Sequence, residues 1–497
     1  MDAESAVETG PNAEAGAENL KNRVLSALRW TAVARLTAQV ITWAVTIVVI
    51  RVLDPADYGL MAMSEVVFGL LMMMSTAGLG SALIQAKDID DSQVRRMFGV
   101  LLLVNGALFA ALFLGAPLVG SYYREPRVVD LSRALALGFL LIPFITVPSA
   151  LLSRDIDFKR KSLVELVGSV VSVLVILALA ATGFGVWALV VGRILALLLQ
   201  AIGLQLVRPF LKLPLFSFRA AKGLISFGGI YTVTTILWFL YSQADIVVAG
   251  RYFDSETLGY YAVAMHLASL VIARSMPLLN QVALPAYSRL QDDPAAVSYY
   301  LCKVVRAATI MAFPVFFGIA LVAPEFVRLV LKPKYESAIL PLVLLSLHMP
   351  LRLLSNLLPA VVYGLGRPRI EMGNAVFGLI VMPIAFLVGI RWGLTGLCVA
   401  WLAAFPLVMG FQVARTLPML RLRLRDFLAQ AGPATGAAAA MSVAVFGAKW
   451  LSGNALPAPA HLALLILVGA AVYFGYVVRF HREHLAEVGR MLRRSDG

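Results

Sequence analysis

The chain has 497 residues, of which 60% are hydrophobic and only 14% are charged, and its formal net charge is +14. An ordinary soluble domain is ~45–50% apolar and ~25% charged, so this composition excludes that class. The two cysteines, Cys302 and Cys398, and five scattered histidines give neither a disulfide framework nor metal-ligand spacing, so no metal site is expected.

Apolar runs follow one another along nearly the whole chain, and each is long enough to cross a ~30 Å hydrocarbon core as a helix. We predict an all-α polytopic membrane protein with about fourteen transmembrane helices. Two pseudo-repeated six-helix lobes surround a central cavity, and a C-terminal helix pair follows. The predicted spans are 29–52, 59–86, 97–123, 131–153, 162–182 and 185–207, then 223–250, 257–285, 300–323, 335–364, 370–390 and 393–414, and finally 428–452 and 460–480.

The regions outside these spans suggest domain limits and an orientation. Residues 1–20 are acidic and small and lack the positive start of a signal peptide. Lys and Arg concentrate in alternate connections, so the positive-inside rule predicts that both termini are cytoplasmic. Anionic lipids account for the same charge without a nucleic acid. The predicted limits are 1–24 for a disordered cytoplasmic tail, 25–210 for the N-lobe, 211–420 for the C-lobe, 421–480 for the last two spans and 481–497 for a basic cytoplasmic tail.

A short hydrophilic sequence occurs twice, 200 residues apart. "RVLDPADYGLMAM" begins at Arg51 and "RYFDSETLGYYAV" begins at Arg251, and each follows the first span of a six-helix set. Asp54-Pro55 and Asp254-Ser255 are helix-start signals. Any tight hairpin between membrane helices has a similar composition, but equivalent positions in two six-helix sets favour a repeat. The aligned identities are Arg51/Arg251, Asp54/Asp254, Gly59/Gly259 and Ala62/Ala262.

Three segments carry a resemblance to a known family. "RVLDPADYGLMAM", "GLGSALIQAKDID" (78–90) and "SALLSRDIDFKRKS" (149–162) resemble polysaccharide exporters of the MOP (multidrug/oligosaccharidyl-lipid/polysaccharide) superfamily. The similar proteins include Wzx-type flippases and the branch of colanic-acid and teichuronic-acid exporters. The resemblance covers about residues 25–480. It implies a V-shaped fold that moves undecaprenyl-diphosphate-linked sugar units to the outer leaflet of the bacterial inner membrane by alternating access.

Deep polar residues are the candidates for a transport path, because a charge at the bilayer centre costs at least ~2.5–3.5 kcal/mol on insertion scales. In the first span a polar face combines Arg35, Gln39, Thr42 and Thr46. In the seventh, Trp238 and Asp245 share a face with Tyr231, Thr235 and Ser242. Such faces line a cavity or form interhelical hydrogen bonds. The charged residues near span centres are Arg35, Glu65, Arg193, Asp245, Arg274 and Arg352.

The eighth and tenth spans each combine an arginine with a histidine. Arg274 shares a helical face with His266, and Arg352 shares one with His348 and Asn356. A guanidinium group can bind phosphate oxygens in pairs and stays charged, so these faces suit a diphosphate. The alternative is that each arginine pairs with a carboxylate or a helix end, and that the histidines are packed.

Glu65 and Asp245 are candidates for a coupling site, because a proton or Na⁺ can bind a carboxylate in a transport path. They are equally candidates for structural partners of buried cations, and Arg193 for a cavity or an interfacial position. Lys449, near a span end, is predicted to extend toward the interface. No cofactor beyond a coupling ion is expected.

The leading prediction is a flippase for a polyprenyl-diphosphate-linked oligosaccharide of an exopolysaccharide, capsule or O-antigen. Membrane lipids and a polysaccharide polymerase or export machinery are its expected partners. The alternative is a MOP exporter of another substrate, of the drug or lipid II type, although a cationic drug favours carboxylates rather than the arginines seen here. A membrane glycosyltransferase or polymerase is less favoured, because catalysis usually needs a large outer loop with acids or histidines. We therefore expect no enzyme.

Overall fold

The computed structural model describes residues 45–76, 90–155, 157–210, 212–216, 229–453 and 455–483, and the regular structure in these ranges is helical. Eleven helical stretches there are long and apolar enough to cross a membrane, or twelve if the bent pair α9 and α10 is one span. One of the eleven, Pro368–Leu420, contains both α14 and α15. The prediction of a polytopic all-α membrane protein is confirmed.

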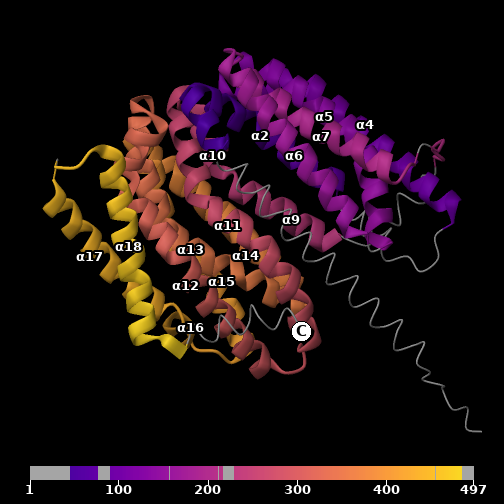
Figure 1. Ribbon diagram of the computed structural model, residues 1–497. Helices are drawn as coiled ribbons and strands as arrows, with labels where there is room; N and C mark the ends of the chain where they lie inside the picture. Colours follow the sequence, from indigo (N-terminus) through magenta and orange to yellow (C-terminus); the bar gives the residue numbers. More distant parts are fainter. Residues whose placement is uncertain are drawn as a thin grey trace, which may run out of the picture.

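The first predicted lobe corresponds to helices α2 to α7 (Figure 1). Residues 45–52 are helical, and the rest of the predicted first span lies outside the described residues. Proline inside a helix is tolerated in membrane proteins, and α4 and α5 contain such prolines. The helices are α2 (Pro55–Thr76), α4 (Asp91–Tyr123), α5 (Arg127–Arg154), α6 (Phe158–Ala181) and α7 (Val186–Val207).

The second lobe begins with a broken helix. α9 (Gly229–Ser242) and α10 (Ala244–Tyr252) meet at a bend of 41°. A π-helical turn, η1 (Val327–Leu331), and a 3₁₀ turn, η2 (Pro333–Ala338), join two of the long helices; two further 3₁₀ turns are η3 (Ile390–Trp392) and η4 (Leu417–Leu420). The long helices of this lobe are α11 (Ser255–Arg289), α12 (Pro294–Phe326), α13 (Ile339–Gly364), α14 (Pro368–Gly389) and α15 (Gly393–Thr416).

The last two long helices are α17 (Gly432–Ser452) and α18 (Ala458–Phe480), preceded by the short α16 (Leu424–Ala429). Both pack against each other and against α12 of the second lobe. Figure 1 shows them on the side of that lobe away from the N-terminal helices. This position agrees with the prediction that the pair stands outside the repeat.

The two lobes share one packing pattern. In the first, α5 packs against α2, α4 and α7, and α6 packs against α7; in the second, α13 packs against α11, α12 and α15, and α14 packs against α15. Matching the helices in chain order makes these contacts equivalent. The sequence repeat is therefore also a repeat of helix packing.

The helix-start signals of the repeat act as predicted. α2 begins at Pro55 and α11 begins at Ser255. The Asp254 carboxylate accepts a hydrogen bond from the backbone of Thr257, at 3.0 Å. At the equivalent turn, the Asp54 backbone donates to the Asp57 carboxylate, also at 3.0 Å. Acidic side chains at these positions satisfy backbone groups and favour the positive end of the helix dipole.

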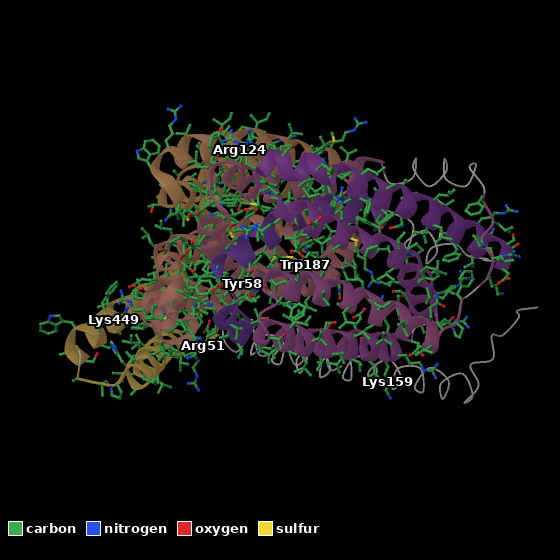
Figure 2. The ribbon with its side chains drawn as sticks, turned by 90° about the horizontal axis from the view of Figure 1, so that it is seen from above. Arg51, Tyr58, Arg124, Lys159, Trp187 and Lys449 are labelled. Atoms are coloured by element: carbon green, nitrogen blue, oxygen red, sulfur yellow. The ribbon has the colours of Figure 1, made fainter. Side chains whose placement is uncertain are left out.

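The lobes meet where α2 lies against α11, with α10 beside them (Figure 1). The largest apolar core of the described residues runs through both lobes at this contact and includes Leu60, Met63, Leu258 and Tyr261. Figure 2 shows Arg51 and Tyr58 in this middle region, with Lys159, at the start of α6, far along the first lobe. The contact is therefore concentrated at one end of the helices.

Candidate functional site

Arg352 lies where three helices of the second lobe converge. Its guanidinium carbon is 5.3 Å from the centroid of the Trp401 ring, and its Nη1 is 3.7 Å from the sulfur of Met265. These partners come from α15 and α11, while Arg352 is on α13. The side chain is half-buried, and no carboxylate of the described residues lies within ion-pair distance. An aromatic ring orients the guanidinium group without neutralising its charge.

Trp401 also connects this region to Asp245. The Trp401 indole donates a hydrogen bond to the Tyr261 hydroxyl at 2.8 Å, and the Tyr261 hydroxyl donates to an Asp245 carboxylate oxygen at 2.5 Å. The other Asp245 oxygen accepts from the Ile246 backbone at 2.8 Å. Asp245, Tyr261 and Trp401 are all buried. A deep carboxylate with its own hydrogen-bond chain needs no arginine partner to be accommodated.

His348, one turn before Arg352 on α13, is completely buried. Its ring lies 4.9 Å from Trp401 and 4.5 Å from Phe405, between centroids. Neither ring nitrogen has a hydrogen-bond partner among the described residues. His348 therefore packs against the Trp401 and Phe405 rings, which agrees with the alternative of a packed histidine.

Arg274 and His266 lie on α11, the helix that packs against α2 of the other lobe. Both side chains are exposed, in contrast to the buried His348. No described residue forms an ion pair with Arg274. Trp238 on α9 is 37% exposed, and Asn356 on α13 is half-buried. Of the two candidate arginines of the second lobe, Arg274 on α11 is therefore exposed and Arg352 on α13 is half-buried.

Glu65 and Arg193 form an ion pair between α2 and α7 of the first lobe. The Arg193 Nε lies 3.7 Å from a Glu65 carboxylate oxygen, and both side chains are nearly half exposed. The Arg193 guanidinium carbon is also 5.9 Å from the Phe68 ring centroid. Two residues that were separate candidates in the sequence are thus partners. The predicted Arg35 and Gln39 lie outside the described residues.

Lys449, in the last turn of α17, has a partner that the sequence did not indicate. Its ammonium group lies 2.9 Å from a Glu325 carboxylate oxygen on α12. It also donates to the Leu321 carbonyl. Both charged side chains are only 21% exposed. This pair ties α17 to the second lobe, and Figure 2 shows Lys449 on that side of the molecule.

Sequence reasoning also missed Tyr261 and Trp401, which link Asp245 to the Arg352 region. Tyr261 occurs in the second copy of the repeat, "RYFDSETLGYYAV", where an aromatic residue in an apolar run gives no signal of its own. Only the fold shows that its hydroxyl faces a carboxylate.

The amino-acid sequence is similar to a known protein family and to several of its relatives. The family model described as "Polysaccharide biosynthesis protein" matches residues 48–340. The teichuronic acid biosynthesis protein TuaB of Bacillus subtilis is 23% identical over 84% of this chain and 87% of its own length. The lipopolysaccharide biosynthesis protein WzxC of Escherichia coli is 24% identical over 75% of this chain and 76% of its own length.

Solved structures agree on the fold. The lipid II flippase MurJ, in an inward closed conformation, has a TM-score of 0.72 and 13% identity, covering 92% of this chain and 99% of that chain. An inward-facing multidrug resistance MATE transporter of the MOP superfamily has a TM-score of 0.59 and 16% identity. The match covers 80% of this chain and 98% of that chain. At these identities the two likenesses show a shared fold. The chain belongs to the family described as "Polysaccharide biosynthesis protein" and has the fold seen in the MOP superfamily.

Proposed function

We propose that this protein flips a polyprenyl-diphosphate-linked oligosaccharide from the inner to the outer leaflet of a bacterial cytoplasmic membrane. Support comes from the family and from the relatives named for teichuronic acid and lipopolysaccharide biosynthesis. The fold adds support, because a flippase for another lipid-linked saccharide shares it over nearly the whole chain.

The observation that carries the proposal is the pair of arginines in the second lobe. Arg274 and Arg352 lie on α11 and α13, which pack against each other, and neither pairs with a carboxylate of the described residues. A lipid diphosphate supplies the anionic oxygens that such guanidinium groups bind in charge-assisted hydrogen bonds. Trp238 and Asn356, with exposed and half-buried side chains, are candidates for sugar contacts.

The remaining candidates complete the proposed site. Arg35 and Gln39 of the first span are proposed to face the substrate from the first lobe, and His266 to share the exposed face of Arg274. Arg193 is proposed to be released from Glu65 when substrate binds, since the pair is half exposed and has a long 3.7 Å separation. His348 is proposed to act through the position of Arg352 rather than by direct contact.

Two carboxylates are proposed to couple the cycle to an ion. Glu65 has one cationic partner, Arg193, and protonation or Na⁺ binding at Glu65 would compete with it. Asp245 is held by Tyr261 and a backbone amide in a buried site. H⁺ and Na⁺ are both compatible with these two sites.

In the proposed orientation both termini are cytoplasmic, following the distribution of Lys and Arg. The end at which α2 and α11 begin then faces outward. The proposed division is an N-lobe of 25–210, a C-lobe of 211–420 and a final helix pair within 421–480, between cytoplasmic tails of 1–24 and 481–497. Membrane lipids and a polysaccharide polymerase or export complex are the proposed partners.

The proposal is tested in a strain from which the gene has been deleted. We expect loss of a surface polysaccharide and accumulation of its polyprenyl-diphosphate-linked unit on the cytoplasmic side. The wild-type chain should reverse both effects, and Arg352→Ala, present at the same level in the membrane, should not. A deletion strain with normal surface polysaccharide and no lipid-linked intermediate would reject the flippase proposal.

A further inference from the structure

The two copies of the sequence repeat lie against each other across the lobes. A Cβ added to Gly59 of α2 would overlap the carbonyl oxygen of Ser255, and a Cβ added to Gly259 of α11 would overlap the carbonyl oxygen of Pro55. Position 55 corresponds to 255 and position 59 to 259 at the 200-residue offset. The contact is therefore reciprocal, as at a two-fold interface. Only glycine permits this approach of the backbones.

A loop of the second lobe closes over the first copy of the repeat. The Lys334 ammonium group lies 3.0 Å from the Asp54 carboxylate and donates to the Val52 carbonyl at 3.0 Å. The Tyr335 hydroxyl donates to the Leu53 carbonyl at 3.1 Å. Both lysine and tyrosine belong to η2, between α12 and α13. One turn of the second lobe thus binds the three residues that precede α2.

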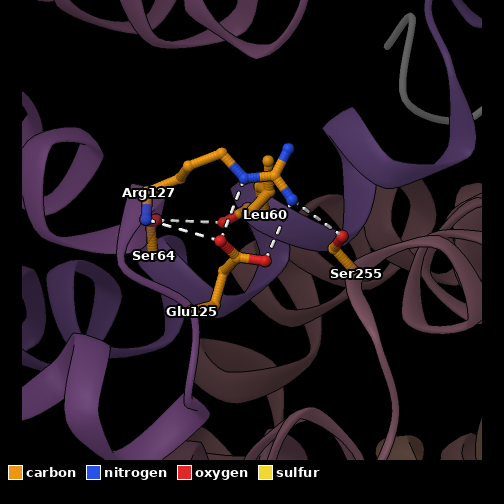
Figure 3. Close-up of polar contacts among 5 residues, drawn as sticks. All are labelled: Leu60, Ser64, Glu125, Arg127 and Ser255. Carbon is orange, nitrogen blue, oxygen red and sulfur yellow. Dashed lines mark hydrogen bonds and ion pairs between the residues drawn. The ribbon is translucent and has the colours of Figure 1, made fainter.

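The equivalent loop of the first lobe closes over the second copy. The Arg251 guanidinium donates to the Tyr122 carbonyl at 2.7 Å, and the Tyr122 hydroxyl donates to the Val247 carbonyl at 3.1 Å. Arg127 donates to the Ser255 hydroxyl at 3.3 Å (Figure 3). Tyr122 and Arg127 flank the turn between α4 and α5, the counterpart of the turn between α12 and α13.

The two loops also share a backbone feature. Arg124 has a φ of 56° and Lys332 has a φ of 76°, and they are two of only three non-glycine residues with positive φ in the described part of the chain. A non-glycine residue in this region of φ is uncommon and costs conformational energy. Both strained residues lie at the turns that carry the cross-lobe contacts, which is consistent with turns held in one specific conformation.

Local charges hold the Arg127 side of this assembly in place. Glu125 accepts from Arg127 at 2.9 Å, and this hydrogen bond is the main reason why the pKa of the Glu125 carboxyl is lowered from its usual value (Figure 3). The carboxylate therefore stays ionised at neutral pH. It orients the guanidinium group so that its second nitrogen reaches Ser255 in the other lobe.

We propose that the two repeats and these two turns form a two-fold latch, which closes this end of the transport path and must separate for the substrate to leave. The proposal rests on the proposed function for the identity of what leaves. The cross-lobe polar contacts lie at the ends of helices, and the Asp54 and Lys334 side chains are 76% and 30% exposed. Exposed ion pairs contribute little individually, so such a latch can open reversibly.

The glycine contact gives the latch its sensitivity. An alanine at position 59 or 259 adds a methyl group that only the closed arrangement cannot accommodate. Because the added strain acts on one state, it shifts the population toward the separated state. Gly106 of α4 and Gly318 of α12 are matched controls, since a Cβ there meets no atom within 4 Å.

The first test is cross-linking in the full-length protein, in a background of Cys302→Ala and Cys398→Ala. Asp54→Cys with Lys334→Cys places thiols across the latch, and Arg328→Cys with Glu336→Cys places them across a 2.8 Å ion pair within the second lobe. A short bifunctional thiol reagent should stop polysaccharide export only in the latch pair, and a cleavable reagent should allow recovery. Undiminished export by fully cross-linked latch protein would overturn the proposal.

The second test measures the latch without transport. In purified protein, Gly59→Ala or Gly259→Ala should lower the ratio of closed to separated latch roughly tenfold or more, because ~1.4 kcal/mol of strain already changes a population ratio tenfold. The cross-linking yield of the latch pair should fall with it. Gly106→Ala and Gly318→Ala should leave the yield unchanged. Unchanged yield in all four variants would overturn the latch. A responsive latch in a protein that exports no polysaccharide would instead reject the proposed function.

Discussion

The guanidinium carbon of Arg352 lies 5.3 Å from the Trp401 ring, whose indole nitrogen donates to Tyr261. Because Tyr261 in turn donates to Asp245, two aromatic residues connect Arg352, proposed to bind the diphosphate, to Asp245, a candidate coupling carboxylate. A change of ion occupancy at Asp245 can therefore reach Arg352 through packed groups.

Arg352→Ala and Arg274→Ala should each reduce the apparent affinity for the lipid-linked substrate roughly ten- to a hundredfold and so impair flipping. The reason is that charge-assisted hydrogen bonds contribute about 1.5–3 kcal/mol each. Arg→Lys retains the charge but loses the planar fork, so partial activity is expected. The measurement is surface polysaccharide in the deletion strain, with protein level checked by immunoblot. Normal polysaccharide from both alanine variants would exclude the anion site.

Tyr261→Phe should destabilise the second lobe, because it leaves an Asp245 oxygen and the Trp401 indole N–H without their partner. A buried polar group left unsatisfied costs about 1–3 kcal/mol. The measurement is thermal unfolding in detergent. Tyr300→Phe, at an exposed tyrosine of α12, is the control and should leave the melting temperature unchanged. Equal melting temperatures for both variants would contradict a structural role of the hydrogen bonds that Tyr261 makes to Asp245 and Trp401.

The ion pair between Lys449 and Glu325 should stabilise the docking of α17. Lys449→Met alone leaves the largely buried Glu325 carboxylate uncompensated and should lower stability, whereas the double variant Lys449→Met with Glu325→Met should recover part of it. Glu336→Gln, which breaks the exposed pair with Arg328, should have an effect within about 1 kcal/mol. A double variant less stable than either single variant would contradict this account.

Glu65→Gln should uncouple transport from its driving ion while the protein remains folded, because the side chain is nearly half exposed and its partner Arg193 retains other contacts. The measurement is flipping in proteoliposomes with an imposed pH or Na⁺ gradient. Stimulation by a gradient should be present in the wild-type protein and absent in the variant. Full stimulation of Glu65→Gln would assign coupling elsewhere, with Asp245→Asn as the next variant.

The helical plan could be predicted from hydropathy because the bilayer requires long apolar helices, and thirteen of the fourteen predicted spans have counterparts among the described helices. The helix starts at Pro55 and Ser255 were also predictable, since Asp-Pro and Asp-Ser are local signals. The sequence pattern also indicated that Gly59 and Gly259 are equivalent. It carried no information that the two glycines touch.

The side-chain partners were not predictable for a physical reason. Helical periodicity shows which residues share a face, but the partner on another helix depends on how helices pack. Glu65 and Arg193 therefore remained separate candidates until α2 and α7 were placed together. The partner of Lys449 could not be predicted because Glu325 is on α12, far away in the sequence. His348 shared a face with Arg352, but Trp401 and Phe405 cover it.

The most direct test of the central claim is flipping by purified protein in liposomes that contain a polyprenyl-diphosphate-linked oligosaccharide. The fraction of saccharide on the outer surface is followed with a membrane-impermeant enzyme or lectin. Wild-type protein should make the lipid in both leaflets accessible over time, and Arg352→Ala at the same density should do so much more slowly. Accessibility that stays at the level of protein-free liposomes with the wild-type protein would contradict the flippase account.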